Sequence, residues 1–256
     1  MNLKNIKGFL FDLDGVFYIS DNIIDGAIET LNYLKNNGIS YRFVTNTTTK
    51  SRSDLFKKLN NLGLPILEKE IISACYAGVL KLRKLDSPKV RLILQNSAKS
   101  EFKEFKIDNI NPEIIVIGDL DKSWDFEIIN SIFNQVMNGA KILALHKGKF
   151  FKTSAGLQID SGAFIKGIEY ATSTKSIIVG KPTSNFFKMA INDLKVNKEN
   201  VAMVGDDLIN DILGAQQNGV YTILTKTGKF HQPTFEKSNV SPDLVISSIK
   251  ELPKFL

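Results

Sequence analysis

The sequence predicts an α/β protein with a parallel sheet, in which a second α/β domain is inserted into the first. Three observations carry this prediction. Short apolar runs alternate with amphipathic segments near the N-terminus, and the same alternation resumes near the C-terminus. Between them, residues 77–175 alternate as well, but their apolar runs do not end in clusters of polar residues as the outer runs do.

The first apolar run, residues 9–13, predicts a buried strand. Apolar residues then recur at helical spacing over 24–34, with Asp25 as the expected N-cap and Gly38 as the residue that ends the helix. One strand followed by one amphipathic helix is the repeating unit from which parallel sheets are built.

The stretch "ISYRFVTN" predicts the second strand. Ser51 is the expected N-cap of the next helix, which Gly63 ends. Asp54 stands three residues after this cap, as in a capping box. The strand–helix–strand–helix order indicates a parallel sheet that is covered by helices.

The C-terminal part continues the same pattern. Its helices are expected in "LINDILGAQQNG", in the second half of "DLVISSIKEL", and where one apolar face is formed by Phe186, Phe187, Ala190, Ile191 and Leu194. Its strands are expected in "SIIVGKP", "VAMVGDD", "VYTILTKTG" and the first half of "DLVISSIKEL".

The middle part also alternates. Strands are expected in "VRLILQ", "EIIVIG" and "KILALH", and helices around 126–137 and 162–171. Insertion of a domain into a loop is well tolerated, because the two ends of a domain often lie close together. We therefore expect residues 1–76 and 176–256 to form one domain and residues 77–175 to form the inserted one.

Polar residues follow the predicted strands of the outer domain, where ligands bind in an open parallel sheet. The first strand leads to Asp12 and Asp14, and the second to Thr45 and Asn46. The later strands lead to Lys181, and to Asp206 and Asp207 with Asp211 close behind. Taken together, these strand ends describe a single candidate site.

The aspartates of this set suit a metal ion. Asp12 and Asp14 are two residues apart, so in a continuing strand both point to one face. Carboxylates held that close repel each other, and a cation would offset their charge. Mg²⁺ prefers oxygen ligands and is commonly held by one or two carboxylates together with a phosphate substrate. Asp206 supplies a third carboxylate.

The remaining residues suit a phosphate group. Lys181 is a compact cation, and Thr45 and Asn46 offer a hydroxyl and main-chain N–H groups. A helix that starts at Asp207 would put Asp207 and Asp211 on one face, where they could hold metal-bound water or orient Lys181. Acidic metal ligands with a lysine and a hydroxyl are suited to phosphoryl transfer, in which a carboxylate can serve as the nucleophile.

The motifs "DLDG", "TN", "GKP" and "GDDLINDILGA", in this order, resemble the four motifs of the haloacid dehalogenase (HAD) superfamily. The insert resembles the C2-type cap of its class IIA, NagD-like members. The stretch from "KGKFFKTSAGLQIDSGAFIKGIEYA" through "VGKPTSNFF" to "TGKF" is similar to the branch with the phospholysine phosphohistidine inorganic pyrophosphate phosphatase and HAD-like hydrolase domain-containing protein 2. The resemblance implies a Rossmann-like HAD core with an inserted α/β C2 cap.

The resemblance also implies roles for three aspartates. Asp12 would be the nucleophile that attacks phosphorus. Asp14 would be the general acid that protonates the leaving oxygen and then the base that activates water. Asp12 and Asp206 would bind Mg²⁺ through their side chains, and Asp14 through its backbone carbonyl. Asp14 argues against dehalogenation, because the dehalogenase branch lacks this second aspartate.

The other site residues would act on the phosphoryl group. By the resemblance, Thr45 and Asn46 would contact it, and Lys181 would neutralise its charge and steady the nucleophile. Thr47 stands where many relatives have a second asparagine. Substrate specificity would lie in the cap, and the loop 160–163 is the first candidate because a helix is expected to start there.

The expected activity is therefore Mg²⁺-dependent hydrolysis of a small phosphorylated molecule. A phosphotransferase or mutase would use the same aspartyl-phosphate, and an inactive HAD-like scaffold would bind partners without turnover. The sequence does not separate a sugar phosphate, a nucleotide, pyridoxal phosphate, pyrophosphate or a phospho-amino acid as the substrate.

Composition limits the partners and the compartment. The net charge is +6, but the lysines are spread along the chain without a dense basic block, so we expect no nucleic-acid partner. No stretch approaches the roughly 20 apolar residues of a membrane helix. Cys75 is the single cysteine and no secretory signal is present, so we expect a cytoplasmic protein. Relatives often dimerise through the cap, which leaves a homodimer open.

Overall fold

The computed structural model describes residues 3–153 and 156–256, and the chain divides into two compact units. The first unit contains Met1–Thr45, Leu55–Ile72 and Lys181–Leu256, and the second contains Asn46–Asp54 and Ser73–Gly180. Residues 77–175, the predicted insert, fall within the second unit, which also takes in the short segment 46–54.

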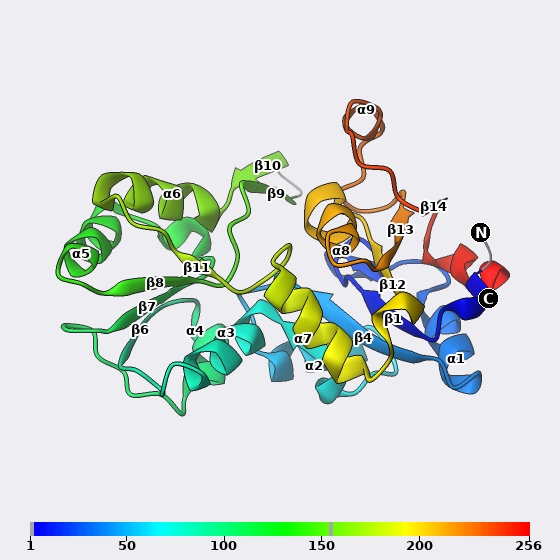
Figure 1. Ribbon diagram of the computed structural model, residues 1–256, viewed down its shortest axis with the longest axis horizontal. Coiled ribbons are helices and arrows are strands. Elements are labelled where there is room, and N and C mark those ends of the chain that lie inside the picture. The colour runs from blue at the N-terminus through cyan, green and yellow to red at the C-terminus, as the bar shows by residue number, and fades with distance from the viewer. Residues whose placement is uncertain (1–2, 154–155) are drawn as a thin grey trace. The chain divides into compact units, whose positions relative to one another are not determined.

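The first unit is built on a six-stranded sheet, of which Figure 1 labels β14, β13, β12, β1 and β4. β1 pairs in parallel with both β12 and β4, so the strand order runs outward in two directions from β1. Such a point is where open α/β sheets bind ligands. In spatial order the strands are β14 (Leu244–Ile246), β13 (Tyr221–Thr225), β12 (Val201–Gly205), β1 (Gly8–Phe11), β4 (Ser40–Thr45) and β5 (Ile71–Ser73).

β1 is buried at every residue, because both faces of this sheet are covered. On one face, Phe11 packs edge-on against Phe17, and Phe17 packs edge-on against Phe43 of the neighbouring strand. All three rings are fully buried. This aromatic cluster holds the strand whose carboxyl end leads to Asp12.

Helices cover the two faces of this sheet. Leucines of α1 (Ala27–Asn36) and α2 (Arg52–Asn61) join the core around Phe11, together with Ile249 and Leu252 of the 3₁₀-helix η7 (Ile249–Phe255). Helix α7 (Ser184–Leu194) contacts β1 and β4 and buries all five residues predicted for its apolar face: Phe186, Phe187, Ala190, Ile191 and Leu194.

The two predicted helix caps have different outcomes. The Ser51 hydroxyl accepts from the N–H of Asp54 at 3.1 Å, as the sequence predicts for the start of α2. Asp25 is not the cap of α1, because Gly26 occupies that position with a left-handed φ of 81°. The Asp25 carboxylate instead pairs with Lys250 at 2.7 Å, so an interaction across the sequence takes the side chain away from the helix end.

The second unit has its own parallel sheet with helices on both faces (Figure 1). Helices α5 (Phe126–Met137) and α6 (Ser161–Thr172) pack on one face through a core that includes Ile115, Ile132 and Ile165. Helix α3 (Ala74–Arg83) lies on the other face, where Gly78 comes close to Leu145. The strands, in spatial order, are β11 (Ile177–Ile178), β8 (Lys141–Ala144), β7 (Ile114–Ile117) and β6 (Val90–Ile93).

The strand predicted in "SIIVGKP" belongs to a different sheet from the one expected. β11 pairs with Leu143 and Ala144 of β8 in the second unit, and not with the sheet of the first unit. An apolar run reveals a strand but not its neighbour, because pairing depends on residues far away in the sequence. Lys181 therefore reaches its site from a connection between units rather than from the end of a strand in the six-stranded sheet.

No helix in 3–153 or 156–256 is long and apolar enough to cross a membrane.

The remaining elements are short. The hairpins are β2 (Tyr18–Ile19) with β3 (Asn22–Ile23), and β9 (Phe150–Thr153) with β10 (Gly156–Ile159). The short helices are η1 (Leu3–Asn5), η2 (Glu68–Glu70), α4 (Asn96–Lys99), η3 (Ser100–Phe102), η4 (Asp121–Ser123), η5 (Lys198–Asn200), η6 (Leu208–Leu213), α8 (Gly214–Gln216) and α9 (Gln232–Glu236).

Candidate active site

Asp12 and Asp14 follow the carboxyl end of β1, at the point where the strand order diverges. The N–H of Asp12 donates to the carbonyl of Val204 at 2.9 Å, which keeps Asp12 in register with β12. The Asp12 side chain is 13% exposed, whereas Asp14 is open to solvent. Surrounding protein atoms and the charge of Asp12 raise the pKa of Asp14, so this carboxyl keeps its proton to a higher pH than an ordinary aspartate.

Lys181 is the buried cation of the site. Its ammonium donates to Asp12 Oδ1 at 2.7 Å, to Asp211 Oδ1 at 2.7 Å and to the carbonyl of Val44 at 2.9 Å. Burial alone would lower the pKa of Lys181, but the charges of Asp12 and Asp211 outweigh it and raise the pKa. Lys181 therefore carries a fixed positive charge that holds the Asp12 carboxylate in place.

Asp206 and Asp211 follow β12 and are both buried. Asp211 Oδ2 accepts from the N–H of Asp207 at 3.1 Å, while its other oxygen accepts from Lys181. Burial raises the pKa of Asp211 to about 7 against the lowering effect of Lys181, and the charge of Asp12 adds to the rise. Burial and the charges of Asp12 and Asp211 also raise the pKa of Asp206.

Asp207 acts on the local backbone. It caps η6, a single π-helical turn, by accepting from the N–H groups of Ile209 at 3.0 Å and Asn210 at 2.9 Å. Burial would raise the pKa of Asp207, but the charge of Lys229 and, after it, these hydrogen bonds lower the pKa. The predicted short helix after β12 thus begins as a π-turn, which places Asp211 toward Lys181 and leaves Asp207 at the helix start.

Glycines allow the close approach of chain segments around Asp206. Gly15 has φ +88°, and a Cβ there would lie 2.0 Å from Asp206 Oδ2. Gly228 has φ +60°, and its Cβ would lie 1.9 Å from the same oxygen. No side chain fits at either position, so the two glycines are required by the position of Asp206.

Lys229 is a site residue for which the sequence analysis assigned no role. Its N–H donates to Asp206 Oδ2 at 2.6 Å, and its ammonium lies 3.3 Å from Asp207 Oδ2. Burial would lower the pKa of Lys229, but Asp207, Asp12 and Asp206 raise it. The feature of the sequence that could have indicated Lys229 is the position of "TGKF" close after β13. The carboxyl ends of parallel strands meet at one edge of the sheet, so residues after β13 are expected near the site.

Three carboxylates form a cluster suited to a cation. One oxygen each from Asp12, Asp206 and Asp211 lies within 4.8 Å of the others. Asp206 Oδ1 is buried and has no hydrogen-bond partner within residues 3–153 and 156–256. A buried carboxylate oxygen without a donor is costly, and a cation at the cluster would satisfy it. The ligands are all oxygens, a set that fits Mg²⁺ better than a thiophilic metal.

The other predicted residues are placed as follows. Thr45 is buried at the end of β4, one residue after the carbonyl that accepts from Lys181. Asn46 belongs to the second unit, where its side chain lies against Gly180. Asp160 begins α6, as predicted: its Oδ1 accepts from the N–H of Ser161 at 2.6 Å.

Two family models match the chain. Residues 9–108 match a model described as haloacid dehalogenase-like hydrolase. Residues 178–252 match a second model, described as HAD-hydrolase-like. The first range includes Asp12 and Asp14, and the second includes Lys181, Asp206 and Asp211.

Curated relatives match over almost the whole length. The mouse haloacid dehalogenase-like hydrolase domain-containing protein 2 is 36% identical over 247 residues, which cover 96% of this chain and 93% of the relative. The human phospholysine phosphohistidine inorganic pyrophosphate phosphatase is 32% identical over 255 residues, which cover 97% of this chain and 93% of the relative.

Solved structures show the same fold. A 4-nitrophenylphosphatase from Thermotoga maritima superposes with a TM-score of 0.93 at 28% identity and covers 98% of each chain. A p-nitrophenyl phosphatase from Archaeoglobus fulgidus superposes with a TM-score of 0.91 at 26% identity, covering 98% of this chain and 99% of the other. The likeness therefore extends over both units.

Proposed function

The chain belongs to the haloacid dehalogenase-like hydrolases, and we propose that it is a Mg²⁺-dependent phosphatase that cleaves a small phosphate monoester through an aspartyl-phosphate on Asp12. The similarity to a 4-nitrophenylphosphatase and to a phosphatase named for phospholysine, phosphohistidine and pyrophosphate supports phosphate transfer as the chemistry. Hydrolysis of a P–N or P–O–P bond would use the same residues.

The observation that carries this proposal is the surroundings of the Asp12 carboxylate. One of its oxygens is held by Lys181 at 2.7 Å, and the side chain belongs to the oxygen cluster with Asp206 and Asp211. The Asp12 carboxylate is thus held by the Lys181 ammonium and lies in a cluster that could bind a metal ion. Because its side chain is still partly open to solvent, it is positioned as a nucleophile toward phosphorus.

The reaction has two steps. In the first, an oxygen of Asp12 forms a bond to phosphorus and the ester P–O bond breaks, while Asp14 gives its proton to the leaving oxygen. In the second, Asp14 takes a proton from water as that water attacks phosphorus, which releases inorganic phosphate and frees Asp12. The raised pKa of Asp14 suits both tasks, because the carboxyl must be protonated in the first step and accept a proton in the second.

The residues that would hold Mg²⁺ are the side chains of Asp12 and Asp206 and the backbone carbonyl of Asp14. The bound ion would neutralise charge on the phosphate oxygens. In this proposal Asp211 acts through Lys181, which it keeps charged and aligned, and Asp207 acts through the backbone of η6. Thr45 and Asn46 would donate hydrogen bonds to the transferring group.

We further propose that the second unit is the cap that selects the substrate, with 77–175 as the C2-type insert. The loop 160–163 lies at the start of α6, where Asp160 also approaches His146 Nδ1 at 3.7 Å. In this proposal the polar groups of the loop 160–163 contact the leaving part of the substrate. Substrate preference is therefore expected to change with Asp160 and not with the carboxylates of the first unit.

The test is hydrolysis of 4-nitrophenyl phosphate with Mg²⁺ and after removal of divalent ions with EDTA. We expect turnover that requires Mg²⁺ and that falls at least about 10³-fold in Asp12→Asn. Asp25→Asn is the matched control, because Asp25 is exposed and pairs only with Lys250 among the described residues. Equal turnover by Asp12→Asn and the wild type would exclude Asp12 as the nucleophile.

A further inference from the structure

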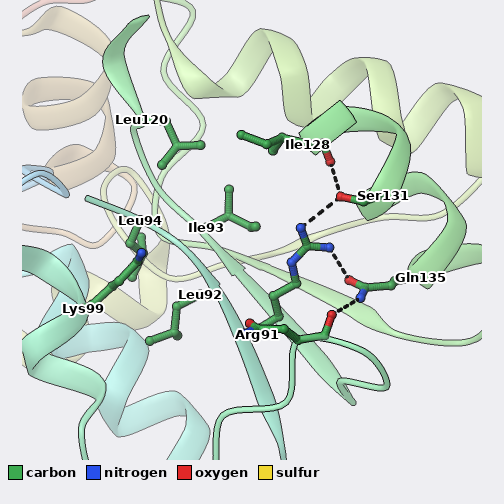
Figure 2. A pocket seen from close by; sticks show the side chains of 10 residues that line it. Arg91, Leu92, Ile93, Leu94, Lys99, Leu120, Ile128, Ser131 and Gln135 are labelled. Atoms are coloured by element: carbon green, nitrogen blue, oxygen red, sulfur yellow. Dashed lines mark hydrogen bonds between the residues drawn. The ribbon is translucent and has the colours of Figure 1, made fainter. Parts of the chain in front are cut away.

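A cavity of about 440 Å³ that is open to solvent lies in the second unit, along β6, an edge strand of its sheet. Figure 2 shows Arg91 reaching from this strand toward helix α5, with Ile93 beside it. The volume is within the range of pockets that bind small molecules. None of the residues that line it belongs to the carboxylate site.

Some of the N–H donors of Arg91 form no hydrogen bond with the described residues. A guanidinium carries five N–H donors. One nitrogen donates to Gln135 Oε1 at 2.8 Å and another to Ser131 Oγ at 2.9 Å. The other donors of Arg91 have no partner within residues 3–153 and 156–256.

The partners of Arg91 are neutral, which is unusual for a partly buried cation. No carboxylate of the described residues forms an ion pair with Arg91, and burial is the one cause that shifts its pKa, which it lowers. Arg83 in the same unit shows the ordinary arrangement, with two bonds to the carboxylate of Glu104 at 2.7 and 2.8 Å. Removing part of this charge from water without a counterion costs free energy, and an anion in the cavity would recover part of that cost.

The guanidinium is held in a fixed orientation. Ser131 Oγ also donates its one proton to the carbonyl of Ile128 at 2.8 Å, which orients its oxygen to accept from Arg91. Gln135 Nε2 donates to the carbonyls of Asn109 at 2.8 Å and Ile110 at 3.2 Å, which fixes the oxygen that faces Arg91. Figure 2 shows the bonds that link Ile128, Ser131, Arg91 and Gln135. A preorganised guanidinium binds a carboxylate or phosphate with little loss of side-chain entropy.

The other residues that line the cavity are mostly apolar. Ile93, Leu120 and Ile128 line the cavity next to Arg91, as Figure 2 shows. Lys99 adds a second positive charge to the lining. We propose that this cavity is a ligand site for a small organic anion, in which Arg91 binds a carboxylate or phosphate head group and the apolar walls contact a short hydrocarbon body.

The experiment titrates hexanoate against the wild-type protein and follows backbone amide shifts by NMR, with hexanamide as the neutral match. We expect hexanoate to shift the amides of Leu92, Ile93 and Ser131 with a Kd on the order of 1 mM, and hexanamide to bind at least tenfold more weakly. Hexyl phosphate, added to Asp12→Asn so that it is not consumed, separates phosphate from carboxylate preference at the same amides.

Arg91→Met keeps the aliphatic bulk and removes the charge, and it should weaken hexanoate binding at least tenfold. Arg91→Lys keeps the charge without the planar fork and should bind at an intermediate level. Arg83→Met is the matched control and should bind as the wild type does. Equal shifts with hexanoate and hexanamide, full binding by Arg91→Met, or no shift at tenfold above the expected Kd would each overturn the proposal; the first and third need only the wild-type protein.

Discussion

Lys181 Nζ lies 2.7 Å from Asp211 Oδ1, and both side chains are buried. The same nitrogen lies 2.7 Å from Asp12 Oδ1, so Lys181 joins the proposed nucleophile to a second carboxylate. Asp211 thereby keeps a positive charge beside Asp12 in an interior that would otherwise favour the neutral amine. The buried ion pair of Lys181 with Asp211 therefore positions the second ion pair, that of Lys181 with Asp12.

Replacement of this lysine separates its two roles. In Lys181→Met, kcat for 4-nitrophenyl phosphate is expected to fall about 10²–10³-fold, because the charge that steadies Asp12 is lost. The free energy of unfolding should fall by about 3–5 kcal/mol, because Asp211 is left buried without its partner. Urea denaturation followed by circular dichroism measures the second effect.

The double variant Lys181→Met/Asp211→Asn is the control. It removes both buried charges of the pair, so we expect it to regain much of the lost stability while turnover stays low. A double variant as unstable as Lys181→Met alone would contradict a structural role for the Lys181–Asp211 pair.

Gly15 should be essential for the position of Asp206. In Gly15→Ala the new Cβ would meet Asp206 Oδ2 at 2.0 Å, so we expect the Mg²⁺ concentration for half-maximal activity to rise about 10–100-fold. Gly38→Ala is matched, because Gly38 also has a positive φ but nothing lies within 4 Å of its Cβ. That control should lose about 1–2 kcal/mol of stability and keep its Mg²⁺ requirement. The same Mg²⁺ requirement in both variants would contradict the prediction.

Lys229 should set the pH range of activity. Desolvation by surrounding protein atoms and the charge of Asp12 raise the pKa of Asp14, while the charges of Lys229 and, after it, Lys58 lower this pKa. Removing a neighbouring positive charge therefore raises this pKa further. In the proposed mechanism Asp14 must be protonated to act as the acid, so the alkaline limb of kcat/KM should move to higher pH in Lys229→Met, and less far in Lys58→Met.

Lys250→Met serves as the control for this pH profile, because Lys250 is exposed and pairs with Asp25 away from the site. Its alkaline limb should coincide with that of the wild type. A shift of the Lys229→Met limb toward lower pH would show that Lys229 does not act on the general acid through its charge.

Glu169 should make the second unit sensitive to acid. Burial would raise its pKa, but bonds from Lys147 at 2.6 Å and from the Ser176 hydroxyl at 2.6 Å lower the pKa to about 2. A lowered carboxylate pKa contributes stability that is complete above the unfolded pKa and is lost as pH falls toward the folded value. Glu169→Gln should therefore cost about 2 kcal/mol at neutral pH, with the difference from the wild type shrinking between about pH 4.5 and about pH 2.

Trp124 reports this transition, since it is the single tryptophan and stacks on Phe164 of α6 at 4.5 Å. Urea unfolding followed by its fluorescence measures the second unit directly. Glu104→Gln is the matched surface variant, because Glu104 pairs with Arg83 in solvent, and its stability should stay close to that of the wild type. A constant difference between Glu169→Gln and the wild type across this pH range would contradict the assigned cause.

Much of the site was predictable because its residues stand at strand ends. Asp12, Thr45 and Asp206 each follow an apolar run, and parallel strands bring such ends to one edge. Lys181 was predicted to lie in the site for a partly wrong reason, since the strand before it pairs with β8 in the other sheet. Local patterns give strands and helices, but the choice of neighbour depends on contacts between distant segments.

The sequence by itself determined which residues to expect at the site: a carboxylate pair after β1, a lysine after a glycine, and an aspartate cluster after β12. Only the tertiary structure decided how they divide the work. Asp211 belongs to the carboxylate cluster with Asp12 and Asp206, and Asp207 caps a π-turn. Lys229, which follows the neighbouring strand β13, donates from its N–H to Asp206. The physical reason is that spacing along the chain reports local geometry, whereas charge, burial and hydrogen bonding at a site are set by which distant segments pack together.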